Sequence, residues 1–502
     1  MSYVLGLDLG TGSMKGLLYT KTGELIFSHS EAYPVTSEKK GYSEQAPKDW
    51  IQACEEIITK MIEIVPDSKQ QLEGISFSGQ MHSLVLTNEE DRVVRPAILW
   101  NDVRTTKQCD EIKERLGDTL LKVTKNKALE GFTLPKILWV QENEPENWQK
   151  TRHIMMPKDY LGFYLTGVYY TDYSDAAGTL LLNIKNRSWS SEILEEFDIP
   201  SSYMPKLYES SGQVGQLTPG LKEKFGFETD IKVFAGGADN PCSALGSGLV
   251  SSETAMVSLG TSGVVLTKED DEDVNYEGTL HVFNDVMSDQ LYSMGVTLSA
   301  GNSLHWYKNT FAPEQSYDEL LTKAAQIELG SGGLLFTPYI NGERTPHTNS
   351  QIRGSFIGLD NQHTLDHLTR AVIEGITFSL QDCLSLVEEN KEIKEIISVG
   401  GGSRSELWRQ IQADIFNAPV ITIESQEGPG TGAAMLAALG LGWYHSVEDC
   451  VEKFVSYSEP ISPVPENVKL YNEIYKVYQD VYQNTREITA RLNKVTGVQD
   501  ES

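Results

Sequence analysis

Two short segments of this chain place glycines and hydroxyl groups in a pattern that can bind phosphate. Gly10-Thr11-Gly12-Ser13 follows an apolar run that ends at Asp8, and Gly260-Thr261-Ser262-Gly263 follows a similar run after Ser258. A turn of this kind between two strands can point backbone N–H groups and a hydroxyl at one spot. Asp8 and Ser258 lie 258 − 8 = 250 residues apart, about half of the 502-residue chain. We therefore expect two related halves that face each other across a cleft, with a nucleotide phosphate between them.

The first segment keeps a carboxylate, Asp8, where the second has Ser258. A magnesium ion that bridges nucleotide phosphates is often held by one or two carboxylates and water. The pattern predicts one asymmetric Mg²⁺ ion beside Asp8. The alternative is an aspartate that accepts hydrogen bonds from the amides of the turn.

Asp239 is a candidate for acid–base chemistry. It follows a predicted strand and Gly236-Gly237, and it lies two residues before Pro241, where a helix is expected to begin. An aspartate in that position is a good helix N-cap. It could equally be the general base that takes the proton of a substrate hydroxyl as that oxygen attacks a γ-phosphoryl group. The two roles are compatible.

Consecutive glycines mark another place where a ligand can approach the backbone. Gly400-Gly401-Gly402 joins a predicted strand to a predicted helix, and Ser403 with Glu406 fits a capping box at the start of that helix. Such a helix N-terminus favours phosphate, and glycines allow close contact. Tight packing of the strand on the helix is the alternative.

Polar side chains at two further strand ends could line a pocket for a polyol. They are Gln80-Met81-His82 and the pair Trp100 and Asp102. Each hydroxyl of a sugar must find a hydrogen-bond partner once water is excluded. The alternatives are a histidine satisfied within the core and a surface ion pair between Asp102 and Arg104. Asn341–His347 is a rich polar loop to which we assign no role.

Strand and helix patterns alternate along the chain, which favours an α/β protein with helices on the faces of its sheets. In the first half we expect strands at residues 3–9, 15–20, 24–28 and 74–77 and a helix over 47–64. In the second half we expect strands around 255–266, 291–297 and 395–399 and helices over 365–390 and 468–492. Residues 1–246 and 247–502 are expected to form two domains.

The composition bounds the class of protein. No stretch approaches the roughly 20 apolar residues of a membrane span, and a net charge of −29 repels nucleic acid and anionic membranes, so we expect neither as a partner. The five cysteines are scattered, which argues against a disulfide framework and a zinc site. With no signal-peptide pattern, we expect a cytoplasmic protein.

Together these segments resemble the FGGY family of carbohydrate kinases over essentially the whole chain. Gly131–Asn143 resembles the first family signature, and Gly354–Leu359 with the segment up to Glu374 resembles the second. The likeness is greatest to the xylulokinase subfamily, at Gly79–His82, Leu99–Asp102, Pro157–Tyr160, Ser174–Gly178 and Gly342–His347. The resemblance implies a two-domain actin-like fold, a duplicated ribonuclease H-type architecture with its active site in the interdomain cleft.

The resemblance also implies roles for single residues. Asp239 matches the catalytic base, and Asp8 matches an aspartate associated with the metal and the phosphates. We expect the sugar at Gln80, Met81, His82, Trp100, Asp102 and Asn240. We expect ATP at Gly10, Thr11, Gly12, Ser13 and Lys15 in the first half and at Gly260, Thr261, Gly301, Gly401 and Gly402 in the second. Two departures from the family pattern are Ser83, where glycine is common, and Gly12-Ser13, where Ser-Gly is more usual.

The implied reaction is the phosphorylation of D-xylulose to D-xylulose 5-phosphate, with ATP and Mg²⁺ as cofactors. A kinase of another polyol, such as ribulose, glycerol or gluconate, is the alternative, because the identity of the pocket rests on few side chains. A nucleotide-dependent binding or chaperone-like protein of the actin-like superfamily is a further alternative, and the polar segment Gln80–His82 argues against it. The sequence leaves the oligomeric state open, although dimers are common in such families and a homodimer fits.

Overall fold

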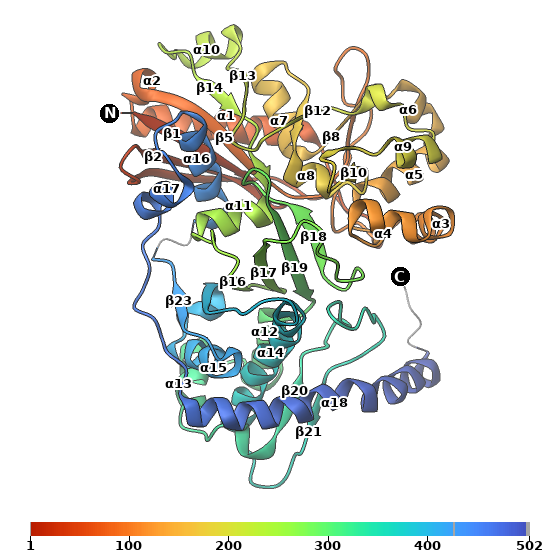
Figure 1. The fold of residues 1–502 in the computed structure, drawn as a ribbon, viewed down its shortest axis with the longest axis vertical. Helices are drawn as coiled ribbons and strands as arrows, with labels where there is room; N and C mark the ends of the chain where they lie inside the picture. Colours follow the sequence, from red (N-terminus) through yellow and green to blue (C-terminus); the bar gives the residue numbers. More distant parts are fainter. Residues whose placement is uncertain (1, 425–426, 498–502) are drawn as a thin grey trace.

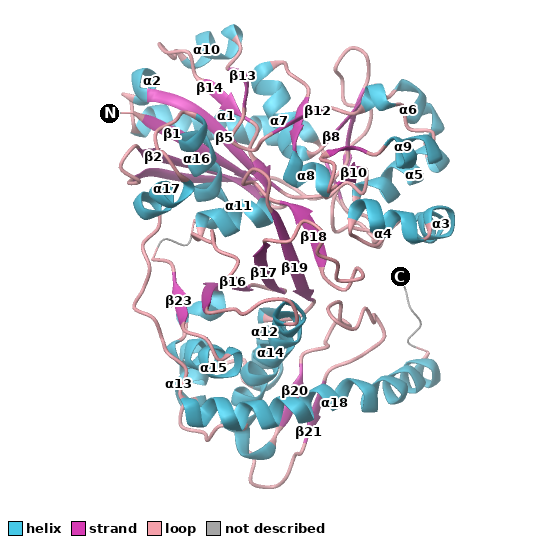
Figure 2. Ribbon diagram, in the orientation of Figure 1, coloured by secondary structure: helices cyan, strands magenta, loops and turns pink. Residues whose placement is uncertain are grey.

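The computed structural model describes residues 2–424 and 427–497. Within them the chain forms two lobes, each built on a β-sheet with helices on its faces (Figure 1, Figure 2). The expected α/β class and two-lobed architecture are confirmed. In this part of the chain no helix combines the length and the apolar character that a membrane crossing requires.

The first sheet has the strand order β13-β14-β5-β1-β2-β3, and β15 also pairs with β5. β1, β2 and β3 are antiparallel, whereas β5 is parallel to β1 and β14 is parallel to β5. Their bounds are β1 Tyr3–Leu9, β2 Ser13–Thr20, β3 Leu25–Ala32, β5 Leu72–Gly79, β13 Gln213–Gln216, β14 Lys232–Phe234 and β15 Gly237–Ala238. β1 and β5 are buried almost throughout because helices cover both faces of the sheet.

The second sheet repeats this arrangement in the order β18-β19-β17-β16-β22-β23. Its bounds are β16 Thr254–Leu259, β17 Gly263–Glu269, β18 His281–Asn284, β19 Leu291–Thr297, β22 Glu395–Gly400 and β23 Val420–Thr422. Asp8 pairs with Ser78 on β5, and Ser258 pairs with Val399 on β22, so the two residues occupy equivalent places. The structure therefore supports the internal duplication that the two glycine-rich segments indicated.

Helix α1 (Pro47–Ile64) has the bounds that the sequence predicted and packs on β2 and β3. Proline begins it, and its buried residues recur at helical spacing: Trp50, Ala53, Cys54, Ile57, Ile58 and Met61. The first lobe also holds α2 Ser68–Gln71, α3 Thr106–Leu116, α4 Asp118–Thr124, α5 Thr133–Asn143, α6 Pro145–Lys150, α7 Pro157–Thr166, α8 Tyr173–Ala177, α9 Ser191–Glu196, α10 Pro219–Phe225 and α11 Asp239–Gly246. Short strands join them: β4 Glu44–Gln45, β6 Val85–Thr87, β7 Ala97–Ile98, β8 His153–Met155, β9 Tyr170–Asp172, β10 Leu182–Asn183, β11 Ser188–Trp189 and β12 Lys206–Tyr208.

The second half of the chain contributes α12 Gly301–Phe311, α13 Tyr317–Ala324, α14 Leu365–Glu388, α15 Glu406–Phe416, α16 Gly428–Gly440, α17 Val447–Phe454 and α18 Pro465–Thr496, with β20 Leu335–Thr337 and β21 Ser355–Ile357. α16 and α17, blue in Figure 1, return to the first lobe, where α16 packs on β1, β5 and α11. One continuous hydrophobic cluster consequently includes Val4 of the first sheet, Ala434 of α16 and Met256 of the second sheet.

Glycines allow the backbone of α16 to pack directly against the backbones of α11 and β1. A Cβ atom on Gly432 would lie 2.0 Å from the carbonyl oxygen of Cys242 in α11. A Cβ atom on Gly6 of β1 would lie 2.2 Å from the carbonyl oxygen of Gly430. No side chain fits at either contact, so the helix pair α11 and α16 and the strand β1 form one tightly packed unit.

We expect Gly432→Ala to destabilise the protein by about 1–3 kcal/mol, because the added methyl group overpacks the contact between α11 and α16. The measurement is the thermal unfolding midpoint. Gly220→Ala is the control, because a Cβ at that helical position meets nothing within 4 Å. Equal midpoints for Gly432→Ala and the wild type would contradict the importance of this contact.

Candidate active site

Asp8 and Asp239 stand at the same edge of the first sheet. β1 and β15 both pair in parallel with β5, and Ser78 is the partner of Asp8 in one pair and of Gly237 in the other. Asp239 is the first residue of α11 and directly follows β15. The two carboxyl groups are close enough that the charge of Asp8 acts on the pKa of Asp239.

Burial raises the pKa of both carboxyl groups. The pKa of Asp239 rises to about 7, chiefly through burial and further through the charge of Asp8. Two N–H groups of Asn240 oppose this shift by donating to Oδ1 of Asp239, from the backbone at 2.8 Å and from the side chain at 3.1 Å. Burial raises the pKa of Asp8 to about 6, against the effects of the Ser78 hydroxyl and the Lys15 ammonium. A carboxyl group with a pKa near neutrality is well matched to accept a proton.

Neither structural alternative for these aspartates, a helix N-cap for Asp239 or an acceptor of turn amides for Asp8, is observed. Ala238 is the N-cap residue of α11, and Asp239 is its first helical residue, without a side-chain cap. Within the described turn Gly10–Ser13, no amide donates to the carboxylate of Asp8.

A buried ion cluster holds the start of α11 in place. The ammonium of Lys158 is fully buried and lies 2.8 Å from a carboxylate oxygen of Asp172. Asp172 accepts a hydrogen bond from the hydroxyl of Ser174 at 2.5 Å, and the same hydroxyl accepts the N–H of Ala238 at 2.9 Å. Because Ala238 immediately precedes Asp239, this cluster positions the Asp239 carboxylate. Our sequence analysis used these segments only for the family likeness and missed this role.

The first glycine-rich loop, Gly10–Ser13, is held by side chains from two other segments. Gln45 donates to the carbonyl oxygen of Thr11 at 2.6 Å, and the indole of Trp100 donates to the Thr11 hydroxyl at 2.9 Å. Within the described residues, the backbone N–H groups of Thr11 and Gly12 donate to no protein acceptor. Both are consequently available to a phosphate.

The side chains of Gln80 and Lys15 both contact other protein groups in the structure. Gln80 is 1% exposed and donates to the side-chain oxygen of Gln45 at 3.2 Å. Lys15 forms an ion pair with Glu427, which immediately precedes α16. The amide of Gln80 is therefore engaged within the protein, whereas the ammonium of Lys15, with its side chain 35% exposed, keeps donors for a phosphate.

The second glycine-rich loop lines a cavity of about 630 Å³ in the other lobe. The structure brings the expected nucleotide residues of the second half together here: Gly260, Thr261, Gly301, Gly401 and Gly402. Apolar walls come from Leu304, Leu321 and Trp408, and polar groups from Asn302, Asp318 and Arg404. The first loop does not line this cavity; it belongs to the opposite lobe.

Close contacts, one with a carbonyl oxygen and one with a leucine side chain, explain two of these glycines. The N–H of Gly301 donates to the carbonyl oxygen of Gly260 at 2.8 Å, and a Cβ on Gly301 would lie 2.5 Å from that oxygen. A Cβ on Gly402 would lie 2.8 Å from Leu259. The predicted capping box is wrong: Gly401–Arg404 forms a 3₁₀ turn, so α15 begins two residues later, with Ser405 as the N-cap that accepts from the N–H of Trp408.

Met81, His82 and Asn240 gather beside Asp239. The sulfur of Met81 accepts hydrogen bonds from the Asn240 side chain at 3.6 Å and from the Tyr292 hydroxyl at 3.8 Å. Nδ1 of His82 lies 2.6 Å from the carbonyl oxygen of Gly178. Burial lowers the pKa of His82 to about 3, and the ring is therefore neutral. Since a carbonyl oxygen only accepts, Nδ1 carries the proton and Nε2 remains an acceptor.

The second lobe supplies part of this wall, which our sequence analysis missed. Phe283 of β18 packs on the ring of His82 at 6.0 Å between centroids, and Tyr292 of β19 reaches Met81. The unassigned loop Asn341–His347 also lies here. Its Thr345 donates to the carbonyl oxygen of Val296 at the end of β19 at 3.1 Å, and the charge of Arg344 helps to lower the pKa of His82. No local motif marks Phe283 and Tyr292, because only the pairing of β18 with β19 brings them to the site.

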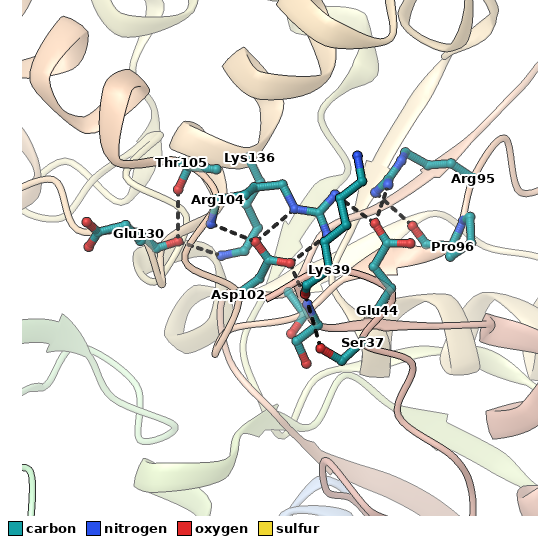
Figure 3. Close-up of polar contacts among 12 residues, drawn as sticks. Ser37, Lys39, Glu44, Arg95, Pro96, Asp102, Arg104, Thr105, Glu130 and Lys136 are labelled. Carbon is teal, nitrogen blue, oxygen red and sulfur yellow. Dashed lines mark hydrogen bonds and ion pairs between the residues drawn. The ribbon is translucent and has the colours of Figure 1, made fainter. Parts of the chain in front are cut away.

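Asp102 is part of a buried charge network (Figure 3). Its oxygens accept from the backbone N–H of Ser43 at 2.6 Å and from the backbone and guanidinium of Arg104 at 2.6–3.0 Å. Arg104 in turn lies 3.6 Å from the ring centre of Tyr42. Four donors occupy the carboxylate, so the geometry favours the ion pair over the expected sugar contact, although this pair is buried and not on the surface. Trp100, in contrast, is 44% exposed.

The metal-binding groups near Asp8 suit a magnesium ion that is held mainly by phosphate oxygens. Within residues 2–424 and 427–497, no group of three His, Cys, Asp or Glu side chains is arranged to hold a metal ion. One carboxylate, phosphate oxygens and water are the ligands that Mg²⁺ takes in nucleotide sites, and Asp8 offers that carboxylate.

Comparison with known proteins gives consistent matches along the chain. The model of the N-terminal domain of the FGGY family of carbohydrate kinases matches residues 3–246, and that of the C-terminal domain matches residues 255–441. A xylulose kinase of Lactococcus lactis is 52% identical over 495 residues, covering 98% of this chain and 99% of the relative. A xylulose kinase of Bacillus subtilis is 47% identical over 493 residues, covering 98% and 99%. The crystal structure of a ligand-bound xylulose kinase from Lactobacillus acidophilus matches with a TM-score of 0.93 at 28% identity, covering 98% of this chain and 100% of that one.

The raised pKa of Asp239 predicts a pH-dependent stability. The folded protein keeps this proton up to a pH of about 7, whereas the unfolded chain loses it near 3.8. Stability from this group is therefore lost as the pH rises through that window. We expect Asp239→Asn to stabilise the protein by about 1–3 kcal/mol at pH 8 and far less at pH 4.

Thermal unfolding midpoints at both pH values provide the measurement. Asp110→Asn is the control, because Asp110 is exposed on α3. An equal effect of Asp239→Asn at pH 4 and pH 8 would show that the carboxyl group is not perturbed.

Proposed function

We propose, from the premise that this chain belongs to the FGGY family of carbohydrate kinases, that it transfers the γ-phosphoryl group of ATP to the terminal hydroxyl of D-xylulose. The resemblance in the sequence is confirmed by both family models and by full-length relatives. The observation that carries the proposed mechanism is the position of Asp239, between the wall of Met81, His82 and Asn240 and the strand that bears Asp8.

Asp239 is the proposed general base. The hydroxyl oxygen of the sugar forms a new bond to the γ-phosphorus, and the bond from that phosphorus to the bridging oxygen breaks with its electrons leaving on ADP. The hydroxyl proton passes to Asp239. Oδ1 of this carboxylate is already bonded to Asn240, so Oδ2 is the proposed acceptor. A pKa of about 7 leaves a substantial fraction ionised at neutral pH.

The two lobes are proposed to divide the nucleotide between them. The cavity at Gly301 and Gly402 suits the base and ribose, and the free N–H groups of Thr11 and Gly12 suit the phosphates. Asp8 would hold the Mg²⁺ ion, which supplies neutralisation of the phosphate charge when it is bound. Exclusion of water as the lobes close would prevent ATP hydrolysis.

The sugar is proposed to lie against the first lobe. Nε2 of neutral His82 would accept a hydrogen bond from a sugar hydroxyl, and the side chain of Asn240 would offer amide groups beside Asp239. Trp100 presents an exposed ring next to Thr11 and could pack on the carbon skeleton. Gln80 and Asp102, with their side chains engaged elsewhere, are proposed to support the site from behind.

A panel of acceptors tests the substrate. We expect ADP release from MgATP to be stimulated strongly by D-xylulose and weakly by D-ribulose, L-ribulose, glycerol and gluconate. Stronger stimulation by another polyol would identify that polyol as the substrate and leave the kinase mechanism unchanged. Hydrolysis of ATP that ignores every sugar would contradict both and favour an ATPase of the actin-like class.

Asp239→Asn tests the general base. We expect turnover to fall roughly 10²–10⁴-fold, because an amide cannot take the proton, while the Kd for D-xylulose stays close to that of the wild type. The wild-type pH profile of kcat/KM should show an acid limb near 7, which the variant should lack. Asp110→Asn serves as the matched control, and near-normal turnover of Asp239→Asn would remove Asp239 as the base.

A further inference from the structure

Arg344 is a cation for which the protein provides no acceptor. Within the described residues its guanidinium donates no hydrogen bond and forms no ion pair, and the charges of Glu130 and Glu343 act on it only from a longer distance. Burial lowers the pKa of Arg344 from its usual value, although the guanidinium stays charged at neutral pH. A cation withdrawn from water in this way is costly unless a ligand supplies the missing acceptor.

The backbone on either side of Arg344 is held firmly to the second sheet. Thr345 donates its N–H to the carbonyl oxygen of Val296 at 3.1 Å, and its hydroxyl accepts the N–H of Val296 at 3.2 Å. The buried carboxylate of Glu343 accepts the N–H of Leu298 at 3.0 Å and that of Arg344 at 2.8 Å. The loop therefore presents the Arg344 side chain from a fixed position, with Glu343 bonded to backbone groups and not to the guanidinium.

The strand pairing places this loop next to His281. The N–H and C=O of Val296 both bond to Thr345, at the edge of β19 that faces away from β17. On the same edge, two residues earlier, His281 of β18 pairs with Met294. Thr345 thus continues the edge that β18 occupies, and Arg344 lies beyond the end of β18.

Two neutral histidine rings near Arg344 can only accept hydrogen bonds. Burial and the charge of Arg344 lower the pKa of His281 to about 3, as they do that of His82. Nδ1 of His281 lies 2.9 Å from the side-chain oxygen of Asn126, whose amide nitrogen donates to two carbonyl oxygens. Nδ1 therefore carries the proton, so Nε2 of His281 is an acceptor like that of His82. The ring of Phe132 joins the two, at 5.7 Å from His281 and 4.5 Å from His82 between centroids.

We propose that the guanidinium of Arg344 binds the C2 carbonyl oxygen of the ketose and so recognises the substrate as a ketone. This assignment rests on the proposed function, the phosphorylation of D-xylulose. A ketone oxygen only accepts and a guanidinium only donates, so the two are complementary. The hydroxyls beside the carbonyl can donate to Nε2 of His82 and of His281. One donor next to two acceptors matches a carbonyl flanked by hydroxyls.

The order of groups along the wall sets the direction of the sugar. Asp239, which takes the proton of the terminal hydroxyl in the proposed reaction, is bonded to Asn240, and Asn240 contacts the sulfur of Met81. His82 follows Met81, and the charge of Arg344 acts on His82 from the second lobe. An open-chain ketose with its reacting end at Asp239 consequently extends its carbonyl end toward Arg344.

Arg344→Met tests the contact, because methionine removes every donor and keeps an unbranched side chain. We expect the KM for D-xylulose to rise roughly 10–100-fold, as for loss of a hydrogen bond from a charged donor, while kcat and the KM for ATP stay within about twofold. Arg344→Lys should recover part of the loss, because an ammonium still donates. Arg486→Met is the matched control, because Arg486 is exposed on α18. An unchanged KM for D-xylulose in Arg344→Met, or a rise in the KM for ATP instead, would overturn the proposal.

Xylitol separates this proposal from the proposed function, because it has a hydroxyl at C2 where D-xylulose has the carbonyl. The wild type should prefer D-xylulose by kcat/KM, and Arg344→Met should lose roughly tenfold or more of that preference. If D-xylulose does not stimulate the wild type, the proposed function fails and this assignment fails with it. A wild type that is stimulated by D-xylulose, with the same preference over xylitol in Arg344→Met, would overturn only the assignment of the carbonyl to Arg344.

Discussion

Backbone-to-backbone packing of α16 on α11 and β1 is the constraint on which the rest of the structure depends. α16 belongs to the second half of the chain, yet its glycines seat it on the first sheet beside Asp8 and against the helix that begins with Asp239. Because both carboxyl groups belong to one lobe and share one packed unit, their separation does not depend on the angle between the lobes. In the proposed mechanism, that independence would allow the second lobe to deliver a nucleotide while Asp239 stays in place.

Charges are buried in two different ways in the first lobe. Asp102 has the Arg104 guanidinium and Asp172 has the Lys158 ammonium, so each buried carboxylate is compensated by a cation. Within the described residues Asp239 forms no ion pair with a cation, and burial together with the charge of Asp8 raises its pKa to about 7. Compensated carboxylates support the fold, whereas an uncompensated one is held in a state that can exchange a proton.

Much of the fold could be predicted from local pattern. The helix over residues 47–64 and the paired hairpins after Asp8 and Ser258 follow from apolar spacing and glycine-rich turns, which act over a few residues. The predicted capping box at Ser403 was wrong because a 3₁₀ turn over Gly401–Arg404 moves the start of the helix to Glu406. The directions in which the side chains of Gln80 and Asp102 point could not be predicted from the sequence either.

The sequence by itself determined that the chain has two related halves, each with a strand–turn–strand loop, and it singled out Asp8, Asp239 and the Met81-His82 segment as candidates for the chemistry. Only the tertiary structure decided that Gln80 and Asp102 turn inward, and that β18, β19 and the loop bearing Arg344 complete the wall at His82. The physical reason is the distance along the chain over which each effect acts. Propensity and periodicity act between neighbours in the chain, whereas burial, pKa and the choice of hydrogen-bond partner depend on residues hundreds of positions away.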